Sequence, residues 1–230
     1  MGYIKKTIKR FMDWSTPSSA ILMLHHVDDY PTICKSGCLV STEKFKKLFE
    51  TVGNFDTLEN VLRSPGRRKI AVTFDDGLID LYTVAYPFLK SKAIPFTAFI
   101  ITDLLETPGY ITDIQLKEMA EDQLVTIGSH GTSNEILKGM PASDQERELR
   151  CSKEVLEKAI GKPVEIFAYS HGQYDSDTLN IVKIYRYACS VRALPLNAIT
   201  AKQRYLLPRY NVENSTVDDV ISKVKKIIKV

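Results

Sequence analysis

The stretch Ile70-Ala71-Val72-Thr73-Phe74-Asp75-Asp76-Gly77 is the most informative segment of this chain. It begins as an apolar, β-branched run of strand length. Because the run does not alternate with polar residues, it predicts a strand buried on both faces, as in a parallel sheet covered by helices. It ends in two adjacent carboxylates, which are costly at the end of a buried strand unless a cation or hydrogen-bond donors hold them. Gly77 then allows a tight turn with room for a ligand.

Six further apolar runs of strand length occur along the chain, with helix-like segments between them. They cover residues 21–24, 95–101, 124–127, 164–169, 187–191 and 209–212. This alternation predicts the α/β class, with a deformed (β/α)7-type barrel of mostly parallel strands. We expect one barrel domain over residues 21–230, preceded by a basic segment over residues 1–20.

Capping residues and apolar stripes predict several of the helices between these strands. The predicted helices are 43–52, opened by Ser41 or Thr42; 143–160, opened by a capping box of Ser143 and Glu146 and ended by Gly161; 176–185, capped by Asp175 or Ser176; and 217–228. The last of these carries its apolar residues on one stripe, which predicts packing against the domain.

The composition is that of an ordinary globular chain. The chain has 230 residues, 44% hydrophobic and 26% charged, which excludes disorder, collagen and coiled coil. Its 31 basic and 28 acidic residues give a net charge of +3, which predicts no surface for nucleic acid. No run approaches the roughly 20 apolar residues of a membrane-spanning helix. Four cysteines are too few for a disulfide scaffold, so we expect a reducing compartment.

Residues 3–14 alternate lysine and arginine with apolar residues at helical spacing. This pattern predicts an amphipathic basic helix and not a secretory signal. The apolar stripe of that helix would either pack on the domain or lie on an anionic membrane surface. We therefore expect a cytoplasmic protein that is either free or in peripheral contact with a membrane through residues 3–14.

Polar residues follow four of the predicted strands. They are His25, His26, Asp28 and Asp29 after the first strand, Asp75 and Asp76 after the second, Ser129, His130 and Asn134 after the fourth, and Ser170 and His171 after the fifth. In a parallel barrel these strand ends share one edge, which is where barrel active sites are assembled. All four histidines of the chain are in this set, whereas unrelated surface histidines would have no reason to share one edge.

The residue types at this edge suit a hydrolytic metal site. One of the carboxylates Asp75 and Asp76 could bind a metal while the other accepts a proton. The alternative is that both merely cap the following helix. His130 and Asn134 are four residues apart, so on a helical turn they would face the same direction. A carboxylate, an imidazole and a third donor, with positions left for water, would make a catalytic site for a divalent metal.

Five segments, in chain order, resemble the motifs of a known family. They are Leu22-Met23-Leu24-His25-His26-Val27, Thr73-Phe74-Asp75-Asp76-Gly77, Ser129-His130-Gly131-Thr132-Ser133-Asn134, Phe167-Ala168-Tyr169-Ser170-His171-Gly172 and Leu207-Pro208-Arg209. In these segments the chain resembles the polysaccharide deacetylases, the NodB-homology domains of carbohydrate esterase family 4. The resemblance extends over roughly residues 21–212.

The resemblance implies a metal-dependent hydrolase that removes N-acetyl or O-acetyl groups from sugars. Asp75 corresponds to the general base, and Asp76 and His130 to metal ligands. Asn134 stands where the family usually has a third, histidine ligand. The expected metal is Zn²⁺, with Co²⁺, Ni²⁺ or Mn²⁺ as alternatives. A water molecule deprotonated by Asp75 would attack the acetyl carbonyl.

The third motif is expected to contact the oxyanion or the substrate. The resemblance implies an oxyanion donor in a backbone N–H near His171, and Ser170, His171 and His26 are expected at substrate-binding or oxyanion-binding positions. Ser170 and His171 stand where the family usually has proline and tyrosine. Ala168 stands where other subgroups place an arginine that orients the base.

The chain lacks the family's late histidine, which usually protonates the leaving group. No histidine follows His171, so the acid would be His25, His26 or His171. His25 is preferred because it matches the strand-one histidine of one subgroup; alternatively it hydrogen-bonds a core carbonyl. Two functions stay open. The first is a deacetylase acting on an acetylated amino sugar, as a precursor or polymer of a surface polysaccharide. The second is a catalytically impaired relative that binds a glycan or a partner enzyme.

Overall fold

A seven-stranded parallel sheet is the centre of the molecule. The computed structural model describes residues 18–30, 38–191, 194, 196, 199–201, 203–213 and 215–228. The strands are β1 (Ala20–Leu24), β4 (Ile70–Phe74), β5 (Phe96–Ile100), β6 (Val125–Ser129), β7 (Ile166–Ala168), β8 (Tyr187–Cys189) and β9 (Tyr210–Asn211). They lie in the order β8-β7-β6-β5-β4-β1-β9, and every pair is parallel. All seven predicted strands are present, and the predicted barrel class is confirmed.

A second, two-stranded sheet was not predicted. It pairs β2 (His26–Val27) in parallel with β3 (Leu39–Val40). Each strand has two residues, which is too short for a hydrophobic pattern to reveal. This small sheet matters for the site because it places Cys38 beside the two adjacent histidines through a hydrogen bond from His26 N to Cys38 O of 3.0 Å.

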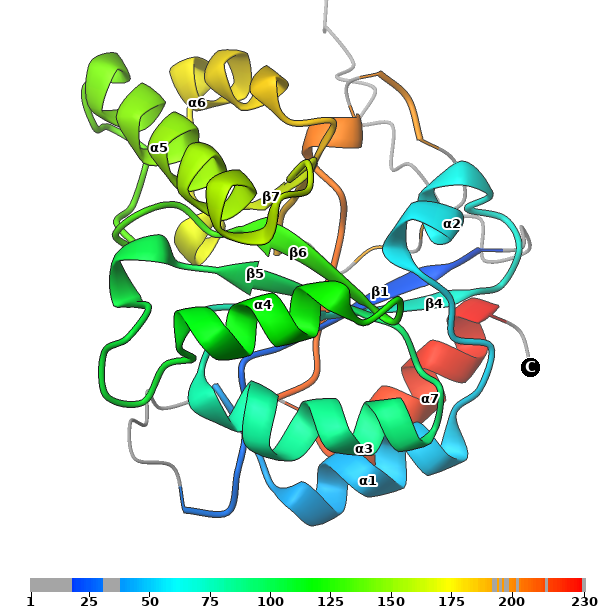
Figure 1. Ribbon diagram of the computed structural model, residues 1–230. Coiled ribbons are helices and arrows are strands. Elements are labelled where there is room, and N and C mark those ends of the chain that lie inside the picture. The colour runs from blue at the N-terminus through cyan, green and yellow to red at the C-terminus, as the bar shows by residue number, and fades with distance from the viewer. Residues whose placement is uncertain are drawn as a thin grey trace, which may run out of the picture.

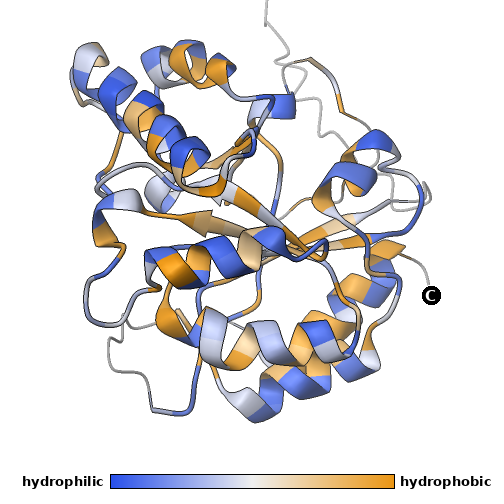
Figure 2. Cartoon of the chain, in the orientation of Figure 1, coloured by the Kyte–Doolittle hydropathy of each residue, from blue (hydrophilic) through white to orange (hydrophobic). Residues whose placement is uncertain are grey.

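Helices cover the sheet in groups. They are α1 (Thr42–Thr51), α2 (Leu58–Arg63), α3 (Tyr86–Ser91), α4 (Asp113–Glu121), α5 (Ala142–Ile160), α6 (Ser176–Ile181) and α7 (Val217–Ile228), with a π-helical turn at Leu81–Ala85 before α3. Figure 1 shows α1, α3 and α7 together on one side, α5 and α6 together on another, and α2 beside β4. Figure 2 shows the strands as mostly hydrophobic and the helices as mixed. Strands β1, β4 and β5 are buried over their whole length, as their predominantly apolar sequences predict.

The sheet has an apolar core on each face. Alternate residues of a strand point to opposite faces, and those that share a face with Ala71 form the smaller core. That core contains Ile21, Ala71, Phe99, Ile166 and Ala168, and it includes Leu58, Val61 and Leu62 of α2. Asp75 follows Ala71 by four residues and Thr73 by two, so its side chain points to the same face of the sheet. We call this face the inner face. It continues directly into the candidate site.

A single segment of the chain contacts strands on both sides of the curled sheet. Leu207 forms a parallel bridge with Cys189 at the end of β8. A few residues later β9 pairs with β1, with Tyr210 opposite Leu22 and Asn211 opposite Met23. The residues between these pairings therefore lie across the inner face, and Arg209 among them is fully buried.

Most of the predicted capping residues are confirmed. Ser41 caps α1 and Asp175 caps α6, the latter with a capping box. Gly161 ends α5 in the left-handed conformation. The predicted capping box of Ser143 and Glu146 is wrong, because α5 begins earlier, at Ala142, with Pro141 at its N-cap. The chain after Ile181 also tightens into a 3₁₀ turn instead of continuing the helix to residue 185.

The N-terminal expectations fall largely outside the described residues. The predicted basic helix over residues 3–14 lies there entirely. Ser19 forms a bridge with Leu196, and Ala20 already belongs to β1. Among the described helices, none combines the length and the apolar character needed to cross a bilayer.

Candidate active site

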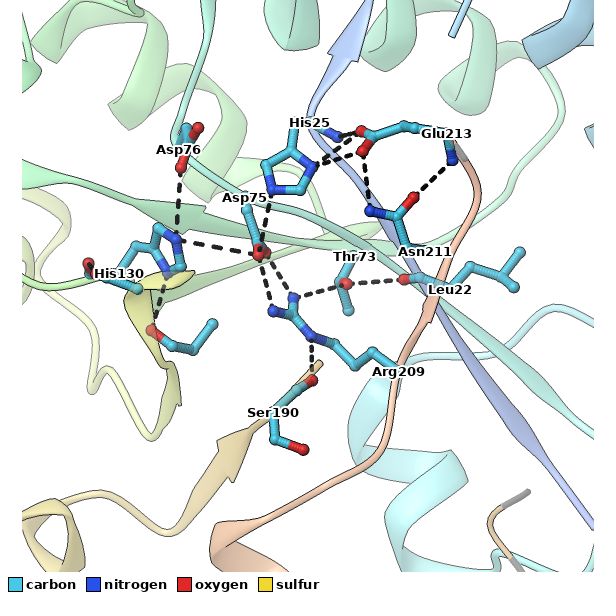
Figure 3. A network of polar contacts seen from close by, with 12 residues as sticks. Leu22, His25, Thr73, Asp75, Asp76, His130, Ser190, Arg209, Asn211 and Glu213 are labelled. Atoms are coloured by element: carbon cyan, nitrogen blue, oxygen red, sulfur yellow. Dashed lines mark hydrogen bonds and ion pairs between the residues drawn. The ribbon is translucent and has the colours of Figure 1, made fainter. Parts of the chain in front are cut away.

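Asp75 is held in a bidentate ion pair with Arg209. The two carboxylate oxygens accept hydrogen bonds of 2.6 Å from Nη1 and 2.7 Å from Nη2. Both side chains are shielded from solvent, with exposed fractions of 2% and 0%. Parallel N–H···O bonds of this kind fix orientation as well as charge. Figure 3 shows Asp75 between Arg209 on one side and the imidazoles of His25 and His130 on the other.

Arg209 is itself fixed on every side. Its Nε donates to the Ser190 carbonyl at 3.1 Å, and Nη1 also donates to Thr73 Oγ1 at 3.2 Å. Its guanidinium lies over the Phe99 ring, 5.3 Å from the ring centroid. The Phe99 ring in turn requires glycine at position 128, because a Cβ there would lie 2.6 Å from two of its carbon atoms. The strands of the sheet therefore fix the guanidinium of Arg209, and this guanidinium fixes the carboxylate of Asp75.

This pairing decides the charge of Asp75. Burial alone would raise the pKa of the carboxyl group and is the largest single influence, but the charges of Arg209, His130 and His25 and the hydrogen bonds from Arg209 together outweigh it. The net effect holds the pKa of Asp75 below its ordinary value. Asp75 is thus an ionised carboxylate in a dry environment, and the alternative that Asp75 and Asp76 cap the next helix is wrong. The next helical turn has Asp80 at its N-cap.

His25 lies between two carboxylates. Its Nδ1 is 2.9 and 3.0 Å from the two oxygens of Glu213, and its Nε2 is 4.0 Å from Asp75 Oδ2. The backbone N–H of His25 also donates to Glu213 Oε1 at 2.5 Å. The Glu213 side chain is fully shielded from solvent, and that of His25 is 15% exposed. Glu213 therefore fixes the ring of His25 with Nε2 turned toward Asp75.

The two carboxylates set the protonation of His25. Burial lowers its pKa, but the hydrogen bond to Glu213 and the charges of Asp75, Glu213 and Asp76 raise it more, to about 9. His25 is therefore an imidazolium at neutral pH. The alternative that it hydrogen-bonds a core carbonyl is not what its ring does here, because both ring nitrogens face carboxylates.

Asp76 and His130 meet at the same edge. Asp76 turns the chain with a φ of 73°, followed by Gly77 at 75°, and the predicted tight turn is confirmed. Asp76 Oδ1 lies 3.4 Å from His130 Nε2. His130 Nδ1 lies 2.8 Å from the carbonyl oxygen of Ala168, which can only accept, so Nδ1 carries the proton. Nε2 is thus the ring nitrogen that faces Asp76.

A divalent metal ion fits the pair formed by Asp76 and His130. A carboxylate oxygen and a neutral imidazole nitrogen are both zinc ligands, and two donors about 2.0–2.2 Å from one tetrahedral ion lie about 3.3–3.6 Å apart. The observed separation of 3.4 Å agrees with that geometry. The hydrogen bond from Nδ1 to the Ala168 carbonyl is of the kind that fixes the ring of a histidine ligand in metal sites.

The loop after β6 is held by a buried glutamate of α5. Glu148 accepts hydrogen bonds from Thr132 N (3.0 Å), Ser133 N (3.1 Å) and Ser133 Oγ (2.8 Å). Burial raises the pKa of Glu148, but these hydrogen bonds together lower it by more. The pKa of Glu148 therefore lies below its ordinary value. Glu148 thus anchors the loop that carries His130 and Asn134.

Asn134 does not lie on the expected helical turn. Residues 131–134 form an irregular loop, and Asn134 has a φ of 66° in the left-handed region. The helical-turn argument for a shared direction with His130 is therefore wrong, because Glu148 satisfies the N–H groups of this loop that a helix would otherwise use. Asn134 is half-buried within the same short loop as His130. Its role as the third ligand stays a prediction.

The third motif folds into a tight turn beside His130. Ser170 is buried, and its Oγ donates to the His130 carbonyl at 3.1 Å. His171 is exposed, with a φ of 54°. Gly172 N donates to the Tyr169 carbonyl and Gln173 N to that of Ser170. Ser170 therefore links two loops of the site, and a direct contact of Ser170 or His171 with substrate stays a prediction.

His26 belongs to a separate pair. It is buried in β2, and its Nδ1 lies 3.4 Å from Asp80 Oδ1, while Asp80 Oδ2 accepts from Val27 N. The structure thus joins the two adjacent histidines to different carboxylates, His25 to Asp75 and Glu213 and His26 to Asp80. The expectation that His26 contacts the oxyanion or substrate stays untested.

Two residues of this site were missed by sequence reasoning. Arg209 was noticed only as part of a family motif, and Glu213 was not noticed at all. Arg209 pairs with Asp75 in this chain, which has Ala168 where other subgroups of the resembled family place the orienting arginine. A signal was available in the sequence, because Arg209 and Glu213 lie at the two ends of the last predicted strand. That strand ends at the same edge of the sheet as the others, so residues near it are candidates for the site.

Comparison with known proteins now places the chain in a family. The family model described as polysaccharide deacetylase matches residues 63–190, more than half of the chain. The chain belongs to the polysaccharide deacetylase family. The match contains Asp75, Asp76 and His130, so the acidic pair and the imidazole of this site lie within the family domain.

Two curated relatives have related sequences. YxkH of Bacillus subtilis is 30% identical over 150 residues, which cover 65% of this chain and 53% of that protein. A poly-beta-1,6-N-acetyl-D-glucosamine N-deacetylase of Staphylococcus aureus is 27% identical over 174 residues, which cover 68% of this chain and 59% of that protein. The chain thus spans a little more than half the length of the curated relatives that it matches.

Solved structures of polysaccharide deacetylases share the fold. A polysaccharide deacetylase from Bacillus cereus aligns with a TM-score of 0.80 and 24% identity, over 91% of this chain and 70% of that one. The Streptococcus pyogenes deacetylase PplD, solved in complex with acetate, aligns with a TM-score of 0.79 and 24% identity, over 91% and 99%. IcaB from Ammonifex degensii gives 0.78 and 21%, over 91% and 97%. These polysaccharide deacetylases confirm the barrel fold of the family member described here.

Proposed function

We propose that this protein is a metal-dependent deacetylase of an acetylated amino sugar. The observation that carries the proposal is the convergence of two imidazoles on Asp75 Oδ2. The Nε2 atoms of His25 and His130 each lie 4.0 Å from that oxygen. Membership in the polysaccharide deacetylase family and the name of the Staphylococcus aureus relative support the choice of substrate class.

Asp76 and His130 would hold the metal, with Asn134 as the proposed third ligand. An amide oxygen is a harder and weaker donor than imidazole, so we expect binding to be weaker than with histidine at that position. When bound, a divalent ion polarises a carbonyl oxygen and lowers the pKa of water in its coordination sphere. We propose Zn²⁺, with Co²⁺, Ni²⁺ or Mn²⁺ as alternatives.

Asp75 would act as the general base. Its ionised form is secured by Arg209, and Oδ2 is the oxygen that faces both imidazoles. A distance of 4.0 Å is too long for a direct hydrogen bond but can be spanned by one oxygen atom bonded to both sides. In the proposed reaction Asp75 accepts a proton from the water molecule that adds to the acetyl carbon.

His25 would act as the general acid. Its Nδ1 is fixed by Glu213, and its Nε2 faces the position of Asp75. As an imidazolium it can donate its Nε2 proton to the sugar nitrogen while the carbon–nitrogen bond breaks. The products are acetate and a free amine, so atoms and charge balance. We also propose that the backbone at His171 and the side chains of Ser170 and His26 contribute to the oxyanion or substrate site.

Acetate release after metal depletion and reconstitution tests this function. The protein is chelated, then reconstituted with Zn²⁺, Co²⁺, Ni²⁺ or Mn²⁺ in turn, and assayed on oligomers of β-1,6-linked N-acetylglucosamine and other acetylated amino sugars. Asp75→Asn should lower acetate release by a factor of about 10²–10⁴, the usual contribution of a general base. Asp177→Asn, an exposed change in α6, is the matched control and should keep full activity.

Absence of metal-dependent release across this panel would contradict the enzymatic proposal. The alternative function, a catalytically impaired relative that binds a glycan, is favoured by one observation, the presence of Asn134 where the resembled family has a ligand histidine. Saturable binding of the same oligomers without turnover would support that alternative.

A further inference from the structure

A second group of potential metal ligands lies beside the proposed catalytic site. One donor atom from each of His25, Cys38 and Glu213 lies within 4.8 Å of the other two. The three residues follow or precede different strands: His25 follows β1, Cys38 precedes β3, and Glu213 follows β9. Each residue is partly buried. The fold thus brings an imidazole, a thiol and a carboxylate together from distant parts of the sequence.

These three side chains match the chemistry of a zinc site. Cysteine sulfur, histidine nitrogen and carboxylate oxygen bind Zn²⁺ at about 2.3, 2.0–2.1 and 2.0–2.2 Å. Two such donors on one tetrahedral ion lie about 3.3–3.6 Å apart by the same geometry. The donors of His25 and Glu213 are already 2.9 Å apart, and the group as a whole spans at most 4.8 Å. Side-chain movements of about 1 Å would therefore complete three-ligand coordination.

The surroundings of the cluster hold two of its members in place. Asn211 Nδ2 donates to Glu213 Oε2 at 3.2 Å, and Asn211 Oδ1 accepts from Glu213 N at 2.7 Å. Figure 3 shows this pair beside His25. The backbone of Cys38 is tied to the residue that follows His25, because His26 N donates to the Cys38 carbonyl at 3.0 Å. Outer-shell hydrogen bonds of this kind orient ligands in metal sites.

We propose that His25, Cys38 and Glu213 form a second metal site, which takes a borderline-soft ion such as Zn²⁺. The sulfur of Cys38 is one of the three donor atoms of this group. The thiolate distinguishes this site from the pair of Asp76 and His130, which offers only nitrogen and oxygen, because soft sulfur ligands select Zn²⁺ over the hard ions Mg²⁺, Ca²⁺ and Mn²⁺.

Occupation of this site has a functional consequence that rests on the proposed function. A histidine bound to a metal through one ring nitrogen is a neutral imidazole, which is a far weaker acid than imidazolium. An ion at the second site would therefore remove His25 from its role as the acid. Zn²⁺ would then activate at the pair of Asp76 and His130 and inhibit at the cluster of His25, Cys38 and Glu213. The existence of the second site does not depend on that role.

The binding test uses Co²⁺ alone as the probe, on the full chain after chelation. Thiolate coordination produces a near-ultraviolet charge-transfer band that nitrogen and oxygen ligands do not produce. Wild type should show this band at saturation. Cys38→Ser and Cys38→Ala should both lose it and should bind the corresponding ion at least about 100-fold more weakly, since loss of an outer-shell partner alone costs about 10–100-fold.

Cys151→Ser is the matched control, because Cys151 is an exposed cysteine of α5. It should keep the band at full intensity. Circular dichroism verifies that each variant is folded. Absence of the band from folded wild type, or its persistence in folded Cys38→Ser and Cys38→Ala, would overturn the second site. This outcome is independent of any enzymatic activity, so it is distinguishable from failure of the deacetylase proposal.

The regulatory consequence is tested by a ratio of activities. For each protein the rate of acetate release with excess Zn²⁺ is divided by the rate with one equivalent. Wild type and Cys151→Ser should show a ratio well below one, and Cys38→Ser a ratio close to one. Equal ratios in wild type and Cys38→Ser would overturn the inhibitory role.

Discussion

Arg209 and Asp75 form a buried bidentate ion pair although 134 residues separate them in the sequence. The pair explains how an ionised carboxylate is kept at the end of a strand that has no access to bulk water. The guanidinium neutralises the charge and also fixes both carboxylate oxygens, so only one direction is left for Oδ2, toward His25 and His130. Orientation of the proposed base is thus a property of the inner face of the sheet.

Removal of Arg209 should destabilise the protein strongly. Arg209→Ala leaves the Asp75 carboxylate buried without a partner, and breaking a buried ion pair in this way costs about 3–5 kcal/mol. Urea unfolding monitored by circular dichroism measures the change in the free energy of unfolding. The control is Arg186→Ala, which removes an exposed arginine paired with Glu59 and Glu165 and should cost about 1 kcal/mol or less. Similar losses in both variants would contradict the buried-pair account.

Gly128 should resist substitution for steric reasons. In Gly128→Ala the new Cβ would lie 2.6 Å from the Phe99 ring, so the ring must move away from the Arg209 guanidinium that it contacts. Overpacking of this kind typically costs about 1–3 kcal/mol. Thermal and urea unfolding measure the loss of stability, and the rate of acetate release should fall with it.

Gly53→Ala is the control for this substitution, because nothing lies within 4 Å of a Cβ at that position. It should be neutral or slightly stabilising, by up to about 1 kcal/mol. If Gly128→Ala proved as stable as Gly53→Ala, the packing of Phe99 between Gly128 and Arg209 would not be a constraint on the site.

Deprotonation of His25 should make the metal-free protein less stable at alkaline pH. Its pKa is about 9 in the folded protein, above the ordinary value of 6.5. A raised pKa stabilises the folded state while the group is protonated, so the contribution is fully present below about pH 6.5 and is lost as the pH rises through 9. The shift corresponds to a contribution of about 3 kcal/mol at most.

Glu213→Gln tests the cause of this shift. It removes the carboxylate that hydrogen-bonds His25, so the pKa of His25 should fall and the alkaline loss of stability should shrink. Titration of the His25 ring signals by NMR in chelated protein gives the pKa directly. Glu165→Gln, a change at an exposed carboxylate, should leave the titration unchanged. An unchanged pKa of His25 in Glu213→Gln would contradict the assigned cause.

Asn134→His should strengthen metal binding at the proposed catalytic site. An imidazole is a better ligand for Zn²⁺ than an amide oxygen, and histidine tolerates the left-handed backbone that Asn134 adopts. Isothermal titration with Zn²⁺ should show an affinity at least about tenfold higher, a change of about 1.4 kcal/mol. Glu135→His, which adds an imidazole at the exposed neighbouring position, should not produce this gain. Unchanged affinity in Asn134→His would show that position 134 is not a ligand.

The sequence predicts the strands better than it predicts the site. The apolar runs are strands because each is long enough to cross the sheet and has both faces covered. The site was recovered where a residue lies next to a strand end, as for Asp75 and His130. It was missed where the partner comes from a distant strand, because the pairing of Arg209 with Asp75 depends on β9 lying beside β1.

Predictions from helical spacing and from capping patterns also failed in two places. The spacing of His130 and Asn134 fits a helical turn, but Glu148 binds the loop N–H groups and an irregular loop results. The capping box of Ser143 and Glu146 has the right residue types, yet the N-cap of α5 is Pro141, two residues earlier than Ser143. The hydrogen bonds from the loop to Glu148 cannot be deduced from local sequence alone.

The late position of β9 gives the protein a built-in order of assembly. A chain synthesised as far as β8 already contains the acidic pair after β4 and the imidazole after β6, but neither Arg209 nor Glu213. In such an unfinished chain the proposed base would have no guanidinium to hold its charge, and His25 would have no carboxylate to hold its proton. The charge of the proposed base and the proton of His25 should therefore be secured in one step, when the last strand docks, so that a nascent or truncated chain would lack both.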